Sequence, residues 1–115
     1  MLTDFAKMDP IHKKVLAKKT SVIMERVSNP VVLSGYLSTL FNNSDKEEIA
    51  ASCNRLGATM GTQTFLSLLE KRGKKAYPLF IEVLKNSELK QEDLAMELEN
   101  EERRLRGQAG EFLYV

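Results

Sequence analysis

The stretch Arg72-Gly73-Lys74-Lys75-Ala76-Tyr77-Pro78-Leu79-Phe80 decides the predicted fold of this chain. Gly73 follows a segment with apolar residues at helical spacing, and a glycine at that place ends a helix and allows a tight turn. Pro78 stands in the first turn of the next such segment, where its missing N–H does little harm. The aromatic side chains of Tyr77 and Phe80 are suited to fill a core. Two helices joined by a short turn are therefore predicted here.

Helical spacing of apolar residues recurs outward from this turn in both directions, and no alternating strand pattern is convincing. Asp9 and Asn29 each precede a proline, which predicts an N-cap followed by a first helical position. Ser44 and Glu47 form a capping-box pattern, and Thr59 is a further candidate cap. The predicted helices cover residues 10–27, 30–41, 44–57, 59–72, 76–84 and a last segment with Leu94 and Leu98 that extends to about residue 105.

Two apolar stripes in the first of these segments indicate either a broad buried face or a bend near Thr20 and Ser21. The loops between the predicted helices are short, and short loops force neighbouring helices to be antiparallel. The fold class is therefore predicted to be all-α, a bundle of six antiparallel helices. The core face of the fourth helix is predicted to consist of Phe65, Leu66, Leu68 and Leu69.

The length and composition fit one globular domain. A chain of 115 residues can bury a single core, and 43% hydrophobic with 29% charged residues argues against disorder. We expect an N-terminal extension at 1–8, the helical bundle at 9–104 and a C-terminal tail at 105–115. The single cysteine, Cys53, excludes an internal disulfide and favours a reducing compartment. The first residues do not resemble a signal peptide, and no apolar run approaches the roughly 18 residues of a membrane span. A soluble cytoplasmic domain is expected.

Three motifs resemble those of caspase recruitment domains, which belong to the death-fold superfamily. Residues 72–80 resemble the junction between the fourth and fifth helices, and their Pro-Leu-Phe form is most similar to initiator caspase prodomains. Residues 29–37 look like the second helix of scaffold proteins of this family, and residues 44–49 resemble the start of the third helix. The match in order and spacing covers about residues 9–100. The resemblance implies a six-helix Greek-key bundle with a bent first helix, and homotypic binding that often builds helical oligomers.

Charges are unevenly distributed along the chain although its formal net charge is only +1. Residues 9–27 carry five basic and two acidic residues, and residues 88–102 carry seven acidic residues and one lysine. Oppositely charged patches on different elements permit head-to-tail association, which does not close and can grow into a filament. Charge complementarity also steers encounter and helps to select partners. The charge-dense segment from Glu97 onward is predicted to be a solvated helix end.

The resemblance assigns part of these charges to a contact between two modules, since a basic face on helices 1 and 4 commonly meets an acidic face on helices 2 and 3. Helix 4 departs from the pattern, because uncharged polar residues stand where many members have arginines, which weakens its part of the contact. The alternative is that all these charges are ordinary solvated helix faces. The implied basic patch is Lys13, Lys14, Lys18, Lys19 and Arg55, and the implied acidic patch is Asp45, Glu47 and Glu48.

Side chains for catalysis or metal binding are scarce. His12 is the only histidine and is predicted to be an exposed helix residue. Cys53 lies on an apolar stripe with Ile49 and Leu56 and is predicted to be a small buried residue. One histidine and one cysteine cannot form a four-ligand zinc site, and residues 57–61 lack the Gly-Lys-Ser/Thr ending of a phosphate loop. We therefore predict no catalytic site, no cofactor and no metal in this chain, although a parent protein could carry a protease.

Two functions remain open from the sequence. The first, implied by the resemblance, is a homotypic module that recruits or assembles signalling partners in apoptosis, inflammation or innate immunity. Its partners would be proteins with caspase recruitment domains, further copies of this chain included. The alternative is a helical nucleic-acid-binding domain that uses the lysines of the first helix. The near-neutral charge and the absence of aromatic residues among these lysines count against nucleic acid, and no membrane partner is expected.

Overall fold

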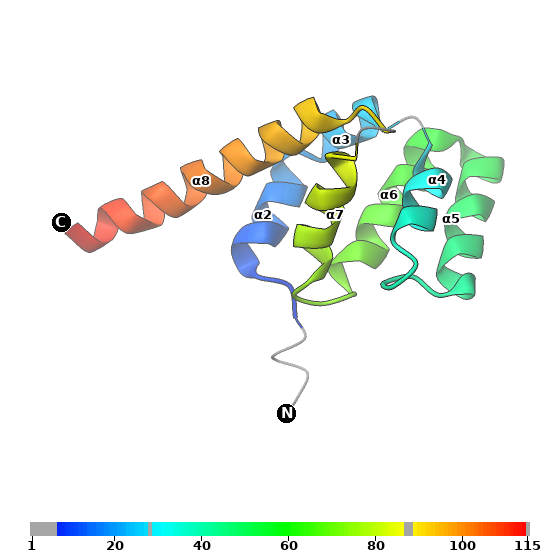
Figure 1. Ribbon diagram of the computed structural model, residues 1–115, viewed down its shortest axis with the longest axis horizontal. Helices are drawn as coiled ribbons and strands as arrows, with labels where there is room; N and C mark the ends of the chain where they lie inside the picture. Colours follow the sequence, from blue (N-terminus) through cyan, green and yellow to red (C-terminus); the bar gives the residue numbers. More distant parts are fainter. Residues whose placement is uncertain (1–6, 28, 87–88, 115) are drawn as a thin grey trace.

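The computed structural model describes residues 7–27, 29–86 and 89–114, and within these ranges all regular structure is helical (Figure 1). This confirms the predicted all-α class. Side chains are described as far as residue 107. The helices are α2 (Pro10–Lys18), α3 (Thr20–Arg26), α4 (Pro30–Tyr36), α5 (Asn43–Leu56), α6 (Ala58–Glu70), α7 (Ala76–Leu84) and α8 (Glu92–Tyr114).

The described residues form seven helices where six were predicted, because the first predicted helix is divided at Lys19. Lys19 has φ −102° and ψ 12°, which lies outside the helical range. The Thr20 hydroxyl donates to the Leu16 carbonyl at 2.7 Å, a bond to the preceding turn of the kind that bends helices. Each half buries its own residues, Val15 and Leu16 in α2 and Ile23 in α3. The predicted bend is thus a full break, one residue before the expected position.

Two of the predicted N-caps are confirmed. The Asp9 carboxylate accepts a hydrogen bond from the Ile11 amide at 2.8 Å, and this bond is the main reason why the pKa of Asp9 lies below its usual value. The Asn29 side chain accepts from the Val32 amide at 3.2 Å. Both caps stand directly before a proline at the first helical position, as the sequence indicates.

The predicted caps at Ser44 and Thr59 are wrong. The capping box of α5 joins Asn42 and Asp45: the Asn42 side chain accepts from the Asp45 amide at 2.8 Å, and the Asp45 carboxylate accepts from the Asn42 amide at 3.1 Å. The helix therefore starts earlier than predicted. The helix α6 begins at Ala58, directly after Gly57, whose φ of +95° is readily available only to glycine. A one-residue turn at this glycine leaves no place for a cap at Thr59.

Two predicted helix ends also differ from the structure. The helix α4 ends at Tyr36, and residues 37–40 form a turn in which the Leu40 and Phe41 amides both donate to the Leu37 carbonyl. Leu37 and Phe41 are nevertheless buried, which explains why their spacing resembled a continuing helix. At the other end of the chain, α8 continues to Tyr114 and extends beyond the bundle, where an end near residue 105 was predicted (Figure 1).

The aromatic residues of the core come from three parts of the chain. Phe65 of α6 packs against Phe41 with ring centroids 5.4 Å apart and against Phe80 of α7 at 5.5 Å. Tyr77 and Phe80, from the stretch that decided the predicted fold, are buried. Leu56 is 64% exposed, so its predicted place on the inner face of the third helix is wrong, because α5 ends at this residue. The predicted core residues of α6 are confirmed as buried: Phe65, Leu66, Leu68 and Leu69.

The helix α6 is central, since it contacts α3, α4, α5 and α7, while α8 packs on α2 and α7. In Figure 1, α2 and α5 lie on opposite sides of the bundle, with α6, α7 and α4 between them. A side chain on the outer face of α2 is therefore far from one on the outer face of α5.

The close approach of α5 and α6 depends on Gly61, which is buried. A Cβ atom there would overlap the Cys53 sulfur and lie 3.3 Å from the Pro30 Cγ atom. We expect Gly61→Ala to lower the free energy of unfolding by about 1–3 kcal/mol through overpacking, measured by urea denaturation. Gly35→Ala is the matched control, because a Cβ at this helical glycine meets nothing within 4 Å. Equal stability of the two variants would contradict the expectation.

Candidate functional site

The outer face of α2 carries two lysines that have no acidic partner among the residues that the structure describes. Val15 and Leu16 face the core, which turns Lys13 and Lys14 toward solvent. Both lysines are exposed, and neither forms an ion pair with any residue that the structure describes. They are the part of the predicted basic patch on α2 that is available to a partner.

Lys18, at the end of α2, and Lys19, between α2 and α3, contact the acidic helix α8. The Lys18 ammonium lies 3.9 Å from the Glu101 carboxylate, and Lys19 lies 3.3 Å from Glu97. Arg26 of α3 contacts the other oxygen of Glu97 at 3.5 Å. The net positive and net negative segments of the sequence thus meet within one molecule. The prediction that the chain from Glu97 onward is a solvated helix end is wrong for this part of it.

A second group of contacts joins the start of α2 to α8. Arg106 lies 3.1 Å from the Asp9 carboxylate and 2.9 Å from that of Glu102. Glu102 also lies 3.1 Å from the His12 ring, which stacks on Tyr77 with centroids 4.0 Å apart and an interplanar angle of 14°. His12 is only 12% exposed, so the prediction of an exposed histidine is wrong. His12 and Glu102 are 90 residues apart in the sequence, so this contact could not be predicted from the local pattern around His12.

The predicted acidic patch on α5 is divided in the same way. Asp45 is 6% exposed and binds the Arg72 guanidinium at 2.5 Å in addition to its role in the capping box. Its charge is therefore used within the fold. Glu47 and Glu48 are exposed on the outer face of α5 and form no ion pair among the described residues. These two carboxylates remain available to a partner.

Arg55 is not brought together with the lysines of α2. It is exposed near the end of α5, on the same helix as Glu47 and Glu48 and across the bundle from α2 (Figure 1). The sequence analysis instead missed a group of lysines around the turn between α6 and α7. Lys71, Lys74 and Lys75 are exposed without an ion pair in the described part of the chain, at the end of the bundle where α2 begins. Four basic residues within 71–75 were the available signal.

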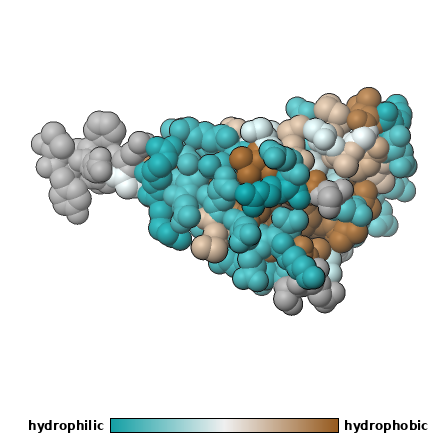
Figure 2. All heavy atoms as spheres, turned by 90° about the horizontal axis from the view of Figure 1, so that it is seen from above, coloured by the Kyte–Doolittle hydropathy of each residue, from teal (hydrophilic) through white to brown (hydrophobic). Residues whose placement is uncertain are grey.

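Large apolar side chains are also exposed where α4, α5 and α6 meet at one end of the bundle. Val31 is 39% exposed, Val32 43%, Leu56 64% and Met60 39%. Figure 2, which views the molecule from above, shows apolar surface gathered over the half that lies away from the C-terminal end of α8. Exposed apolar patches of this kind often mark protein contacts.

The described residues hold no group of three or more histidine, cysteine, aspartate or glutamate side chains that could bind a metal ion. Cys53 is a free, partly buried cysteine that packs against the core. Among the described helices, none combines the length and the apolar character that crossing a membrane requires.

The family model of the caspase recruitment domain matches residues 8–102. The chain belongs to the caspase recruitment domain family. This confirms the resemblance that the motifs suggested. No curated protein and no solved structure matches the chain. Caspase recruitment domains are protein-interaction domains that bind other domains of the same family, and they are not catalytic.

In this caspase recruitment domain the available charges of the two predicted patches include a basic pair and an acidic pair on separate helices. The lysines at 13 and 14 belong to α2, and the glutamates at 47 and 48 belong to α5. Because these helices lie on opposite sides of the bundle, the two surfaces cannot pair within one molecule (Figure 1). They can pair only between molecules.

Proposed function

We propose that this caspase recruitment domain recruits or assembles signalling partners in apoptosis, inflammation or innate immunity by homotypic binding. In this proposal Lys13 and Lys14 of one domain bind a carboxylate surface such as Glu47 and Glu48 of the next. The observation that carries the proposal is that both surfaces are exposed and lack ion pairs among the described residues. We further propose a cytoplasmic location and a Greek-key arrangement of the bundle at residues 9–104, as expected for this family.

The placement of the two surfaces supports open-ended assembly. A contact between different faces of identical molecules is heterologous, and it extends into a filament unless its rotation closes a ring. Lys18 and Lys19 contribute less in this proposal, because each already contacts a carboxylate of α8. Lysines of the turn at 71–75 would extend the basic surface.

A charge-reversal pair tests the proposal. We expect Lys13→Glu/Lys14→Glu to weaken self-association at least about tenfold, because each lysine would face a like charge across the contact. Mixing this variant with Glu47→Lys/Glu48→Lys should restore a complex, since both charge pairs are then reversed. Size-exclusion chromatography with light scattering, across protein concentration and salt, measures both effects.

The variant Glu92→Lys/Asp93→Lys is the matched control, because it makes the same change of net charge at two exposed residues of α8. This control should not restore the complex with the lysine variant. If it restored the complex equally well, the change in net charge, and not the position of the charges, would explain the rescue. Nucleic acid bound by α2 would also be lost in the lysine variant but could not be recovered by the α5 variant. A wild-type chain that stays monomeric throughout would contradict self-association and would require a different caspase recruitment domain as partner.

A further inference from the structure

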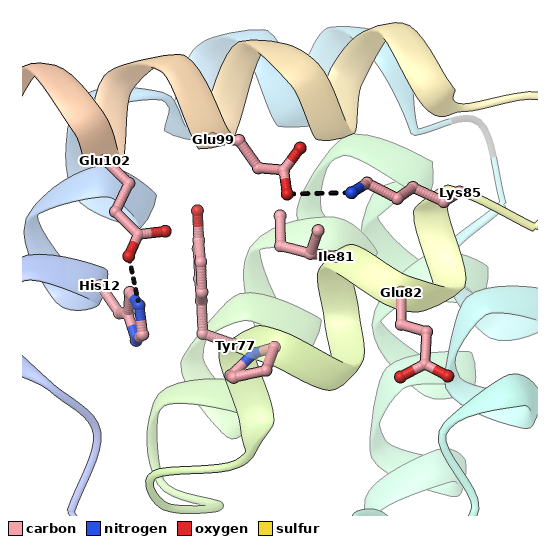
Figure 3. A pocket seen from close by; sticks show the side chains of 8 residues that line it. His12, Tyr77, Ile81, Glu82, Lys85, Glu99 and Glu102 are labelled. Atoms are coloured by element: carbon pink, nitrogen blue, oxygen red, sulfur yellow. Dashed lines mark hydrogen bonds and ion pairs between the residues drawn. The ribbon is translucent and has the colours of Figure 1, made fainter.

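A groove of about 370 Å³ lies between α7 and α8 and is closed at one end by His12 of α2. Its floor is formed by Tyr77 and Ile81, both buried. Figure 3 shows Tyr77 pointing from α7 toward α8, with its ring between His12 and Ile81. The volume falls within the range of sites that hold small groups. The groove is separate from the exposed surfaces of α2 and α5.

Two buried polar atoms at this groove have no hydrogen-bond partner. They are the Tyr77 hydroxyl and His12 Nδ1, and among the described residues only Arg72 Nε is also in this condition. Leaving a buried polar group unpaired costs about 1–3 kcal/mol, so such groups are normally satisfied. Tyr77 is 2% exposed, and its hydroxyl points toward the α8 side of the groove (Figure 3). The groove therefore offers hydrogen-bonding atoms that a polar ligand could use.

Carboxylates dominate the charged groups that line the groove. Glu82, Glu99 and Glu102 line it against the single ammonium of Lys85. Lys85 lies 2.9 Å from Glu99, and Arg106, outside the lining, lies 2.9 Å from Glu102. The exposed Glu82 has no ion pair among the described residues, so the groove keeps an excess of negative charge. Burial, together with the nearby carboxylates, raises the pKa of Tyr77, so the phenol stays protonated and neutral. A cation is thus the complementary occupant.

We infer that this groove binds an arginine side chain presented by a protein partner. A guanidinium is planar, weakly hydrated and carries only donors, which matches the lining carboxylates and the lone pairs of the Tyr77 oxygen. It would share Glu99 with Lys85, and Glu102 with Arg106 and His12. Its aliphatic stem would lie on Ile81. A lysine ammonium is compact and strongly hydrated, so it loses more hydration on entering the groove than a guanidinium does. This second surface would allow the domain to bind a partner through α7 and α8 while α2 and α5 serve homotypic contacts.

The test is a titration of the isotope-labelled protein with three blocked tripeptides, Gly-Arg-Gly, Gly-citrulline-Gly and Gly-Lys-Gly, followed by NMR. Citrulline keeps the shape of arginine but has no charge. We expect saturable shifts at the amides of Tyr77, Ile81 and Glu99 with the arginine peptide, and about tenfold weaker binding of citrulline. Equal shifts with arginine and citrulline, or no saturable shift at these amides, would overturn the inference, because the groove would then have no specific affinity for a guanidinium.

Two variants locate the binding. Tyr77→Phe keeps the ring and removes only the unpaired hydroxyl, and Glu99→Gln removes one carboxylate. Each should weaken arginine binding about five- to tenfold, whereas Glu25→Gln at an exposed residue of α3 should leave it unchanged. Unaltered binding in both groove variants would refute the assignment. Arginine binding by the Lys13→Glu/Lys14→Glu variant separates this inference from the homotypic contact, and reduced self-association of Glu99→Gln would identify a second copy as the source of the arginine.

Discussion

Replacing Asp45 with alanine is expected to lower the free energy of unfolding by about 3 kcal/mol, because the change removes one half of the α5 capping box and breaks a partly buried, charge-assisted hydrogen bond. The carboxylate accepts from the Asn42 amide and binds the Arg72 guanidinium at 2.5 Å. Without Asp45, the Arg72 side chain, which is 30% exposed, would lose this ion pair. Urea denaturation followed by circular dichroism measures the loss.

Further variants separate the two roles of this carboxylate. Arg72→Met removes the ion pair and leaves the capping box intact, and Asp45→Asn removes the charge but keeps an oxygen that can accept from the Asn42 amide. Glu48→Ala is the control on the same helix and should change stability by less than about 0.5 kcal/mol. If Asp45→Ala were as stable as Glu48→Ala, the described role of the ion pair would be wrong. A loss of binding in Asp45 variants would therefore report on folding and not on a partner contact.

The local parts of the fold could be predicted from the sequence. The caps at Asp9 and Asn29, the turn glycines and the core face of α6 depend on residues within a few positions of each other, and these predictions agree with the structure. The error at Ser44 has a local cause too, since two overlapping cap patterns compete near this residue and the sequence does not rank them. The error at Thr59 comes from the turn at Gly57, after which α6 begins directly at Ala58. Helix boundaries are the least determined feature of a single sequence.

The candidate site was predicted less well, because its geometry depends on contacts between distant segments. The sequence showed one positive and one negative segment, but it could not show that α8 lies along α2 and pairs with Lys18 and Lys19. For the same reason it could not show that Asp45 faces Arg72 while Glu48 faces solvent. What remains after these internal pairs are made is the surface that a partner can use.

The apolar core fixes how these surfaces are placed relative to each other, and Phe65 is its most connected aromatic residue. It is fully buried and packs against both Phe41 and Phe80. We expect Phe65→Ala to lower the free energy of unfolding by about 3–5 kcal/mol, through lost apolar burial and a cavity at the centre of the bundle. Urea denaturation should show a lower midpoint with an unchanged slope.

The conservative variant Phe65→Leu should lose less than about 1.5 kcal/mol, since it retains most of the volume, and Met96→Ala at a 57% exposed position should lose almost nothing. A domain of this size is stable by about 5–15 kcal/mol, so the alanine variant is expected to lose a large share of its stability and to unfold at a clearly lower temperature than the wild type. Its self-association should then fall with temperature in step with its unfolding. A loss below about 1 kcal/mol in Phe65→Ala would mean that the three aromatic rings do not hold the bundle together in the way that their packing indicates.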